Sequence, residues 1–289
     1  MHLFSLDAKT KLQALLSFLQ SSFTIGLHEL GWVKVTMSGL KGAVKSIERF
    51  SPDQGTLGKV VRYLEGLVPE YSLVGDSVFF TQEQFPWTAE LEANWQVIRR
   101  ELDQVMPYAD ALPNFQDISP RQGNIANDDR WKTFFFTAFG YRSQQNCQRC
   151  PETAKLLEKI PGLKVAFFSI LAPGKHIPRH RGKHKGIIRC HLALKVPEPK
   201  EACRIQVADQ IAYWEEGKTL IFDDTNYHEV WNDTNDYRVV LFLDIERPLR
   251  FPLSLINRSV NTLVGLSPIV QVAKGNHESW EKQFEAMLR

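Results

Sequence analysis

The segment GIIRCHLALKV at residues 186–196 contains the pattern that decides the fold. Side chains of a β-strand alternate between its two faces, so Arg189 and His191 share one face while Cys190 and Leu192 share the other. A wholly apolar row opposite a row with an arginine and a histidine is unusual for a strand that has one face in solvent. The pattern is typical of a barrel wall, with one face in the core and the other lining a polar cavity.

Short runs rich in Val, Ile, Leu and Phe recur on both sides of this segment and are separated by turn residues. Their spacing is typical of an all-β sandwich or barrel. The predicted strands are residues 164–172, 186–196, 203–208, 218–222 and 237–245.

Upstream of the strands, apolar residues recur at helical spacing. The predicted helices are residues 9–27, 56–67, 87–105 and 151–160. Residues 108–129 are rich in Pro, Asn, Asp and Gly, so we expect a long loop there. Helices followed by a β region predict an α+β protein, with a helical N-terminal region on a jelly-roll core.

The composition is that of an ordinary globular protein. The 289 residues are 43% hydrophobic and 24% charged, with a formal net charge of +2. This mild balance, without a basic stripe, argues against a nucleic-acid partner. No apolar run is long enough for a transmembrane segment, and residues 1–13 lack the apolar stretch of a signal peptide. We therefore expect a cytoplasmic protein, for which weak contact with a membrane surface is compatible with the composition.

The cysteines indicate neither disulfides nor a zinc site. Four cysteines do not make a disulfide framework in a chain of this length. Cys147 and Cys150 form a single CxxC, and Cys190 and Cys203 are too far apart to complete a zinc-site spacing. We interpret the CxxC as ordinary thiols before a helix; a metal or redox role is the less favoured interpretation.

Five of the eight histidines fall within the predicted β region. The spacing of His176, His180 and His184 resembles a helical His-x3-His metal pair, but Pro178 and Gly182 interrupt any helix there. We expect a loop that leads into a strand. In this interpretation His176 and His184 are exposed loop residues.

The segment GKTLIFDDTNYHEVW at residues 217–231 predicts a strand, a polar turn and a histidine, His228, at the start of the next strand. His228 can point into the barrel mouth from the wall opposite His180. Arg238 lies in the apolar strand 237–245, and an unpaired buried charge is costly. A bound carboxylate suits it, because the guanidinium fork binds a carboxylate at two points. Two imidazoles beside such arginines fit a redox metal that holds a dicarboxylate.

These blocks, in this order, resemble the aspartyl/asparaginyl β-hydroxylase family, a branch of the Fe(II)/2-oxoglutarate oxygenases. The resemblance covers roughly residues 90–248 and is carried by His180-Arg-Gly182, RCHLAL at 189–194, CRIQV at 203–207, FDDTNYHEVW at 222–231 and Arg238. It implies a double-stranded β-helix core, Fe(II) as the metal, 2-oxoglutarate as the co-substrate and O2 as the oxidant. We accordingly divide the chain into a helical N-terminal extension of unknown role, an oxygenase domain and a C-terminal extension, at residues 1–85, 86–250 and 251–289.

The resemblance also implies a role for individual residues. It makes His180 and His228 the iron ligands. For 2-oxoglutarate it implies that Arg189 and His191 hold the carboxylate nearest the metal, that Arg238 holds the distal carboxylate, and that a serine on the preceding strand contacts the co-substrate, namely Ser169. Most 2-oxoglutarate oxygenases have a carboxylate two residues after the first histidine. Here that residue is Gly182, as the family pattern leads one to expect, and we expect water in the vacant position.

Two structural hypotheses for these residues stay open. Arg189 and Arg238 could be ion-paired structural residues, with Asp223 or Asp244 as partners. Asp223 or Asp224 could supply a third metal ligand, although the strand–turn geometry disfavours it.

The implied reaction is hydroxylation of an unactivated C–H bond, with 2-oxoglutarate converted to succinate and CO2. The expected substrate is the β-carbon of Asp or Asn in a peptide or protein, because the sequences around His180 and His228 are closer to the peptide branch. Hydroxylation of a lipid A acyl chain competes with it, although that branch usually has a membrane-spanning N-terminus, which we do not find here. A free or carrier-bound amino acid is a third substrate hypothesis. A halogenase and a non-catalytic jelly-roll binder of small molecules are the competing functions.

Overall fold

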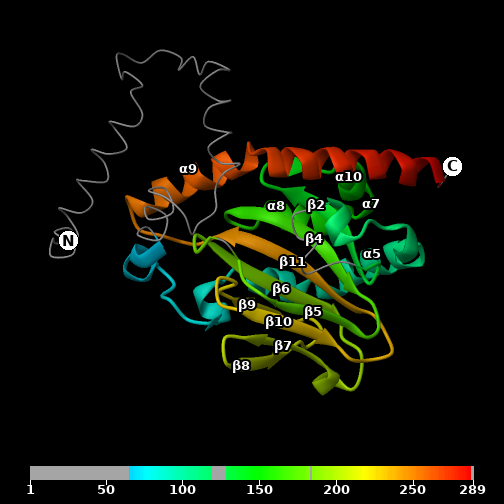
Figure 1. Cartoon of the computed structure of the whole chain (residues 1–289), viewed down its shortest axis with the longest axis horizontal. Coiled ribbons are helices and arrows are strands. Elements are labelled where there is room, and N and C mark those ends of the chain that lie inside the picture. Colours follow the sequence, from blue (N-terminus) through cyan, green and yellow to red (C-terminus); the bar gives the residue numbers. More distant parts are fainter. Residues whose placement is uncertain (1–64, 119–127, 183, 288–289) are drawn as a thin grey trace, which may run out of the picture. The chain divides into compact units, whose positions relative to one another are not determined.

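Two antiparallel β-sheets face one another in the computed structural model, which describes residues 65–118, 128–182 and 184–287 (Figure 1). The larger sheet contains β1 (Phe79–Phe80), β9 (Thr219–Phe222), β6 (Ile187–Lys195), β11 (Arg238–Glu246), β4 (Leu163–Leu171), β2 (Trp131–Ala138) and β3 (Tyr141–Arg142), in that order. The smaller sheet contains β5 (Lys175–His180), β10 (His228–Asn232), β7 (Cys203–Val207) and β8 (Gln210–Tyr213).

From β4 to β11 the chain crosses back and forth between the two sheets. The strands β4, β6, β9 and β11 belong to the larger sheet, and β5, β7, β8 and β10 belong to the smaller one. This alternation makes a jelly-roll, so the predicted α+β fold with a double-stranded β-helix core is confirmed. Predicted helix 9–27 and all but the last residues of predicted helix 56–67 lie outside the described residues; residues 65–71 are helical.

The two faces of β6 differ as predicted, with apolar side chains on one face and Arg189 and His191 on the other. Ile188, Cys190 and Leu192 are fully buried in a cluster shared with the helices. The opposite face, which carries Arg189 and His191, points toward the smaller sheet, where the neighbouring strands contribute the second apolar cluster. The larger sheet therefore separates a helix-facing core from an inter-sheet core.

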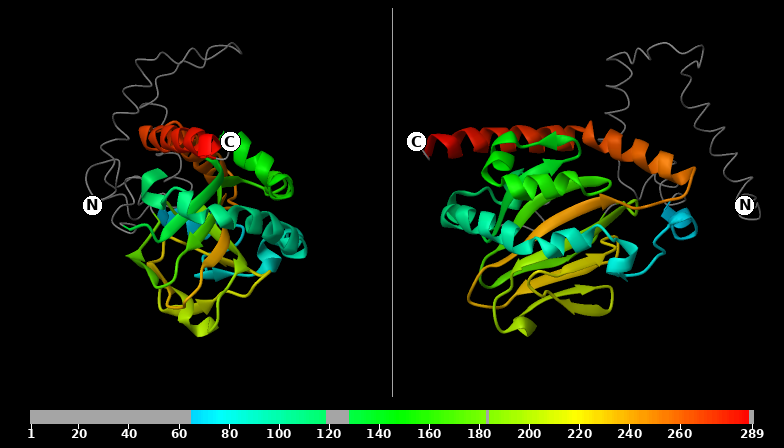
Figure 2. Two further views of the ribbon diagram at one scale, coloured as in Figure 1. Left: turned by 90° about the vertical axis from the view of Figure 1, so that its right-hand side faces the viewer. Right: turned by 180° about the vertical axis from the view of Figure 1, so that it is seen from behind.

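Helices cover the outer face of the larger sheet, as the views in Figure 2 show. Predicted helix 87–105 is two helices, α4 (Thr88–Ala93) and α5 (Trp95–Val105), which are separated at Asn94. The predicted apolar stripe packs against the sheet: Ile98 and Leu102 are fully buried. Predicted helix 151–160 is α8 (Pro151–Glu158), with proline in its first turn.

Several elements have no counterpart in the prediction. They include β2, β5 and β8, and the two long C-terminal helices α9 (Leu253–Gly265) and α10 (Pro268–Met287). The predicted loop 108–129 contains helical turns within its described part. The short helices are η1 (Gln82–Gln84), η2 (Met106–Ala111), α6 (Phe115–Ile118), α7 (Gln144–Arg149) and η4 (Lys200–Ala202).

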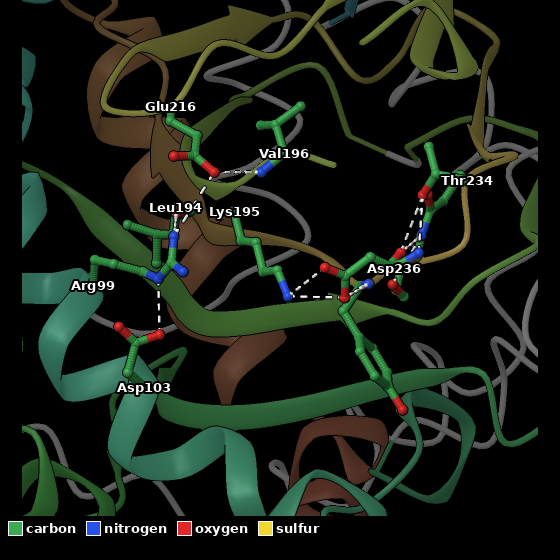
Figure 3. Close-up of polar contacts among 11 residues, drawn as sticks. Arg99, Asp103, Leu194, Lys195, Val196, Glu216, Thr234 and Asp236 are labelled. Carbon is green, nitrogen blue, oxygen red and sulfur yellow. Dashed lines mark hydrogen bonds and ion pairs between the residues drawn. The ribbon is translucent and has the colours of Figure 1, made fainter. Parts of the chain in front are cut away.

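Polar contacts attach α5 to the end of β6 (Figure 3). Arg99 on α5 donates to the carbonyl of Leu194 at 2.7 Å and to the carboxylate of Asp103 at 2.8 Å. Glu216 accepts the backbone N–H of Val196 at 2.9 Å. These contacts fix the strand that carries two of the predicted site residues.

Candidate active site

Two histidines meet across the smaller sheet. His180, the last residue of β5, lies directly opposite His228, the first residue of β10, and their ring centroids are 4.1 Å apart. The pairing shifts by one residue between this pair and the next, Val230 with Ile177, so β5 contains a bulge at Pro178. A proline has no N–H for the ladder and is tolerated at bulges. The bulge turns His180 toward His228.

In both rings Nδ1 forms a hydrogen bond with a backbone carbonyl. Nδ1 of His180 lies 2.8 Å from the carbonyl oxygen of Pro178, and Nδ1 of His228 lies 2.9 Å from that of Asn226. A carbonyl accepts, so each Nδ1 carries the proton and each Nε2 is left as an acceptor. Burial lowers the pKa of His180 to about 4 and that of His228 to about 3, so both rings are neutral at pH 7. Neutral imidazoles with a free Nε2 are suited to bind a metal ion.

The other two histidines of this segment are placed differently from the prediction. His176 lies in strand β5 and not in a loop; it stacks on Trp231 and its Nε2 is 2.6 Å from Glu229. His184 is not an exposed residue, because its Nε2 is buried and its ring lies beside Asn257 of α9. The strand resembles a loop in the sequence because the bulge interrupts the alternation of side chains.

Gly182 lies against the carboxylate of Asp224. The backbone N–H of Gly182 donates to the carbonyl of Asp224 at 2.7 Å. A Cβ at position 182 would lie 2.3 Å from Oδ2 of Asp224, so a side chain at this position would require the carboxylate of Asp224 to move. The carboxylate of Asp224 thus fills the space beside Gly182, and burial raises its pKa. Among the residues that the structure describes, no three or more His, Cys, Asp or Glu side chains are grouped to hold a metal ion.

Arg189 is ion-paired with two aspartates through Nε and Nη2. Its Nε and Nη2 donate to Asp244 at 2.8 and 3.1 Å, and Nη2 also lies 2.9 Å from Asp224. Its guanidinium carbon stands 4.3 Å from the ring centre of Phe242. Asp244 is one of the partners foreseen in the structural hypothesis for this arginine. A contact between Arg189 and the co-substrate stays a prediction.

Arg238 and His191 are buried without hydrogen-bond partners. Arg238 is 1% exposed, its guanidinium lies 4.5 Å from the ring centre of Trp214, and its Nε and Nη1 have no partner within the described part of the chain. His191 is 4% exposed, and neither of its ring nitrogens has a partner among those residues. Burial lowers the pKa of His191 well below its usual value, so its ring is neutral. An unpaired buried cation is costly, which makes an anion the expected occupant beside Arg238.

Ser169 and Trp131 line the same inter-sheet face. Ser169 is buried on β4 two residues before Leu171, the partner of Arg238 in the strand pairing. Its hydroxyl oxygen accepts the indole N–H of Trp131 at 3.0 Å, which leaves the hydroxyl hydrogen free to donate. Neither Trp131 nor Trp214 was predicted from the sequence, because single tryptophans carry no positional signal.

The four cysteines are free and buried. Cys147 and Cys150 lie at the helix pair α7 and α8, and burial raises the pKa of both thiols. This placement agrees with their interpretation as ordinary thiols.

The donor set suits iron with 2-oxoglutarate. Two neutral imidazoles lie side by side, and the buried guanidinium of Arg238 has two nitrogens without a partner among the described residues. The family model described as aspartyl/asparaginyl beta-hydroxylase matches residues 92–248. The chain belongs to this family. Its members are 2-oxoglutarate-dependent dioxygenases, so the protein is a hydroxylase, and membership implies dependence on Fe(II) and 2-oxoglutarate.

Two relatives with different substrates in their names are similar to this chain. The ornithine lipid ester-linked acyl 2-hydroxylase of Rhizobium tropici is 44% identical over 227 residues, which cover 78% of this chain and 81% of the relative. The aspartyl/asparaginyl beta-hydroxylase of Homo sapiens is 37% identical over 163 residues, which cover 55% of this chain and 21% of the relative. The chain therefore spans most of the bacterial relative and about a fifth of the human one.

Solved structures with a similar fold include a Pseudomonas putida prolyl-4-hydroxylase, with 13% sequence identity and a TM-score of 0.36 over 65% of this chain and 98% of that one. The cupin domain of Schizosaccharomyces pombe Cnp3 has 12% identity and a TM-score of 0.29 over 45% of this chain and 70% of that one.

Proposed function

We propose that the protein hydroxylates C2 of an ester-linked acyl chain in an ornithine lipid. The observation that carries this proposal is the 44% identity to the Rhizobium tropici enzyme across 78% of this chain and 81% of the relative. The matched length of 227 residues extends well beyond the family region 92–248, so the similarity includes elements that flank the jelly-roll. A lipid acyl chain is therefore better supported as substrate than the Asp or Asn residue expected from the sequence.

In this proposal His180 and His228 hold Fe(II) through Nε2. The hydrogen bonds from their Nδ1 atoms to backbone carbonyls fix the tautomer and the ring orientation. When bound, iron with 2-oxoglutarate and O2 supplies the oxidising chemistry, in which one oxygen atom enters the C–H bond and the other enters succinate as CO2 is released. Asp224 holds Arg189 beside the metal position and closes the space next to Gly182.

Arg238 holds the distal carboxylate of 2-oxoglutarate. Its two unpaired nitrogens provide the donors, and the free hydroxyl hydrogen of Ser169 provides another. The ring of Trp214 packs on the guanidinium and excludes water from it. His191 is neutral and adds a donor without adding charge. Together these residues orient the co-substrate toward the two histidines.

The test is incubation of full-length protein with Fe(II), ascorbate, O2, 2-oxoglutarate and detergent-dispersed ornithine lipid, followed by mass spectrometry of the lipid. We expect a mass increase of one oxygen on the ester-linked chain, one succinate per hydroxylated lipid, and loss of both in the His180→Ala variant. An Asp- or Asn-containing peptide is assayed in parallel. Hydroxylation of the peptide with an unchanged lipid would overturn the lipid proposal and leave the hydroxylase assignment intact.

A further inference from the structure

Three apolar side chains project into solvent where the chain enters α9. Phe251 is 78% exposed, Leu255 is 59% exposed and Leu73 is 59% exposed. We call these three residues the apolar ridge. Scattered exposed leucines are ordinary, but neighbouring ones are typical of a binding surface.

Paired backbone segments and a small buried cluster support the ridge. The backbone N–H of Leu73 donates to the carbonyl of Pro248 at 2.9 Å, and that of Arg250 donates to Tyr71 at 2.8 Å, so the two segments are paired side by side. Beneath them Leu249 and Leu253 pack in a small buried cluster with residues of helix 65–71. Figures 1 and 2 show this helix, in blue, beside the start of α9 in orange. The exposed side chains are therefore held on ordered backbone.

The α9 side of the ridge carries only positive charge, whereas the segment that carries Leu73 has the exposed acidic residues Glu70 and Asp76. Between Glu246 and Glu278 the sequence contains no acidic residue, although it contains Arg247, Arg250, Arg258 and Lys274. Arg250 and Arg258 are exposed, and they lie next to Phe251 in sequence and one helical turn beyond Leu255, respectively. Apolar side chains flanked by arginines complement an anionic bilayer, in which phosphates lie just outside the acyl region. The net charge of +2 for the whole chain conceals this local excess.

The ridge also lies close to the histidine pair. Only residues 181–186 separate His180 from β6, and this loop contacts α9: Asn257 donates to the carbonyl of Gly186 at 2.9 Å and lies beside His184. Arg247 donates to the carbonyl of Lys185 at 2.8 Å and to the carboxylate of Asp223, in the turn before His228. The base of the ridge is thus bonded to both loops that carry the predicted iron ligands.

We propose that the apolar ridge docks the enzyme on an anionic bilayer surface, with Phe251, Leu255 and Leu73 among the acyl chains and Arg250 and Arg258 at the phosphates. No helix of the described residues is long and apolar enough to cross a bilayer. The functional role of this docking rests on the proposed lipid substrate, because docking would bring the histidine pair to the membrane that contains that lipid.

The first test is co-sedimentation of the full chain with vesicles of equal parts phosphatidylglycerol and phosphatidylcholine, and with vesicles of phosphatidylcholine alone. We expect stronger binding to the anionic vesicles, and a loss of about tenfold or more in the Phe251→Ser, Leu255→Ser double variant. Arg250→Glu with Arg258→Glu should remove the preference for anionic lipid. The matched control is Ile211→Ser with Tyr213→Ser, which changes two exposed apolar residues of β8 and should leave binding unchanged.

The second test separates docking from chemistry. The ridge double variant should hydroxylate detergent-dispersed ornithine lipid like the wild type and lose activity on the same lipid in vesicles. Wild type that binds vesicles through the ridge yet leaves dispersed lipid unchanged would overturn the proposed substrate and support docking. Equal vesicle binding by wild type, ridge variant and control would overturn docking, as would a ridge variant that changes only the oligomeric state in light scattering.

Discussion

Glu101 and Arg238 are buried on opposite sides of the larger sheet and differ in their hydrogen-bond partners. On the helix-facing side Glu101 is buried, and its carboxylate accepts the backbone N–H groups of Glu152 and Thr153 at 2.8 Å and the Thr153 hydroxyl at 2.6 Å. On the inter-sheet side Arg238 and His191 are equally buried, yet the nitrogens Nε and Nη1 of Arg238 and both ring nitrogens of His191 have no partner among the described residues.

The difference shows which buried polar groups find hydrogen-bond partners within the protein itself. A buried group that lacks a partner lowers stability, so a fold keeps one where a ligand supplies the missing bond. Glu101 obtains its partners when the protein folds, whereas in the proposed function a carboxylate and a metal supply those of the inter-sheet residues. Substitutions on the two sides should therefore separate stability from activity.

The largest effect should follow from removing an imidazole. We expect His228→Ala to lower Fe(II) affinity and succinate formation by on the order of 10²-fold or more, because one of two protein donors is lost. His176→Ala is the matched control, since this exposed histidine stacks on Trp231 outside the pair. Calorimetry with Fe(II) under anaerobic conditions measures the first effect. Equal losses in both variants would contradict the assignment of the pair.

Next in size, Arg238→Leu should raise the KM for 2-oxoglutarate by about 100-fold, because the buried cation that faces the carboxylate is removed. Its melting temperature without 2-oxoglutarate should equal or exceed that of the wild type, since an unpaired buried charge disappears. Arg204→Leu is the control: this arginine also lies on a tryptophan ring, at 4.7 Å, but pairs with Asp233. A large drop in the melting temperature of Arg238→Leu would show that this arginine is structural.

Glu101→Ala should have the opposite profile. Three donors lose their acceptor, so the free energy of unfolding should fall by about 2 kcal/mol while kcat and the KM for 2-oxoglutarate stay unchanged. Urea denaturation and the succinate assay measure the two quantities. Glu101→Gln keeps an acceptor and should recover part of the stability. A change in KM without a change in stability would contradict the proposed difference between the two faces.

The smallest effect concerns pH and His277 of α10. Burial lowers the pKa of His277 to about 4. An unfolded chain binds this proton at about pH 6.5, whereas the folded chain does not, so stability is full above that pH and declines as pH falls toward the folded pKa. We expect this group to account for roughly 0.7 kcal/mol of the loss between about pH 7 and about pH 6. His277→Phe should flatten that part of the curve in urea titrations, and an unchanged slope would argue against it.

The strands with strict alternation were predictable from the sequence. In β6 and β11 the division between an apolar row and a row with Arg189, His191 and Arg238 is a local property that needs no tertiary information. Strand β4 was predictable from a nearly continuous apolar run, and both of its faces are buried. The resemblance to a family then supplied the roles of these side chains, which alternation by itself could not.

Features that depend on tertiary contacts could not be predicted. The pairing of Arg189 with Asp244 was one of the sequence hypotheses, but its second ion pair, with Asp224, was not. That pair and the close approach of Asp224 to Gly182 depend on how loops distant in sequence fold together. The strand β5 is hidden because its bulge breaks the alternation. The helices α9 and α10 were not predicted, and parts of both remain exposed.

The bulge at Pro178 also implies a second possible register for β5 against β10. In a regular ladder continued from the Ile177–Val230 pair, Arg179 would lie opposite His228, and His180 would face outward. Such a molecule would be well folded and unable to assemble the histidine pair. Pro178 lies on an edge strand within the bulge, a position where a proline is tolerated, and the observed register pairs His180 with His228. A variant that restores an N–H at position 178 would populate two conformations. Only one of them contains the histidine pair, so the specific activity of a preparation would depend on strand register as well as on metal content.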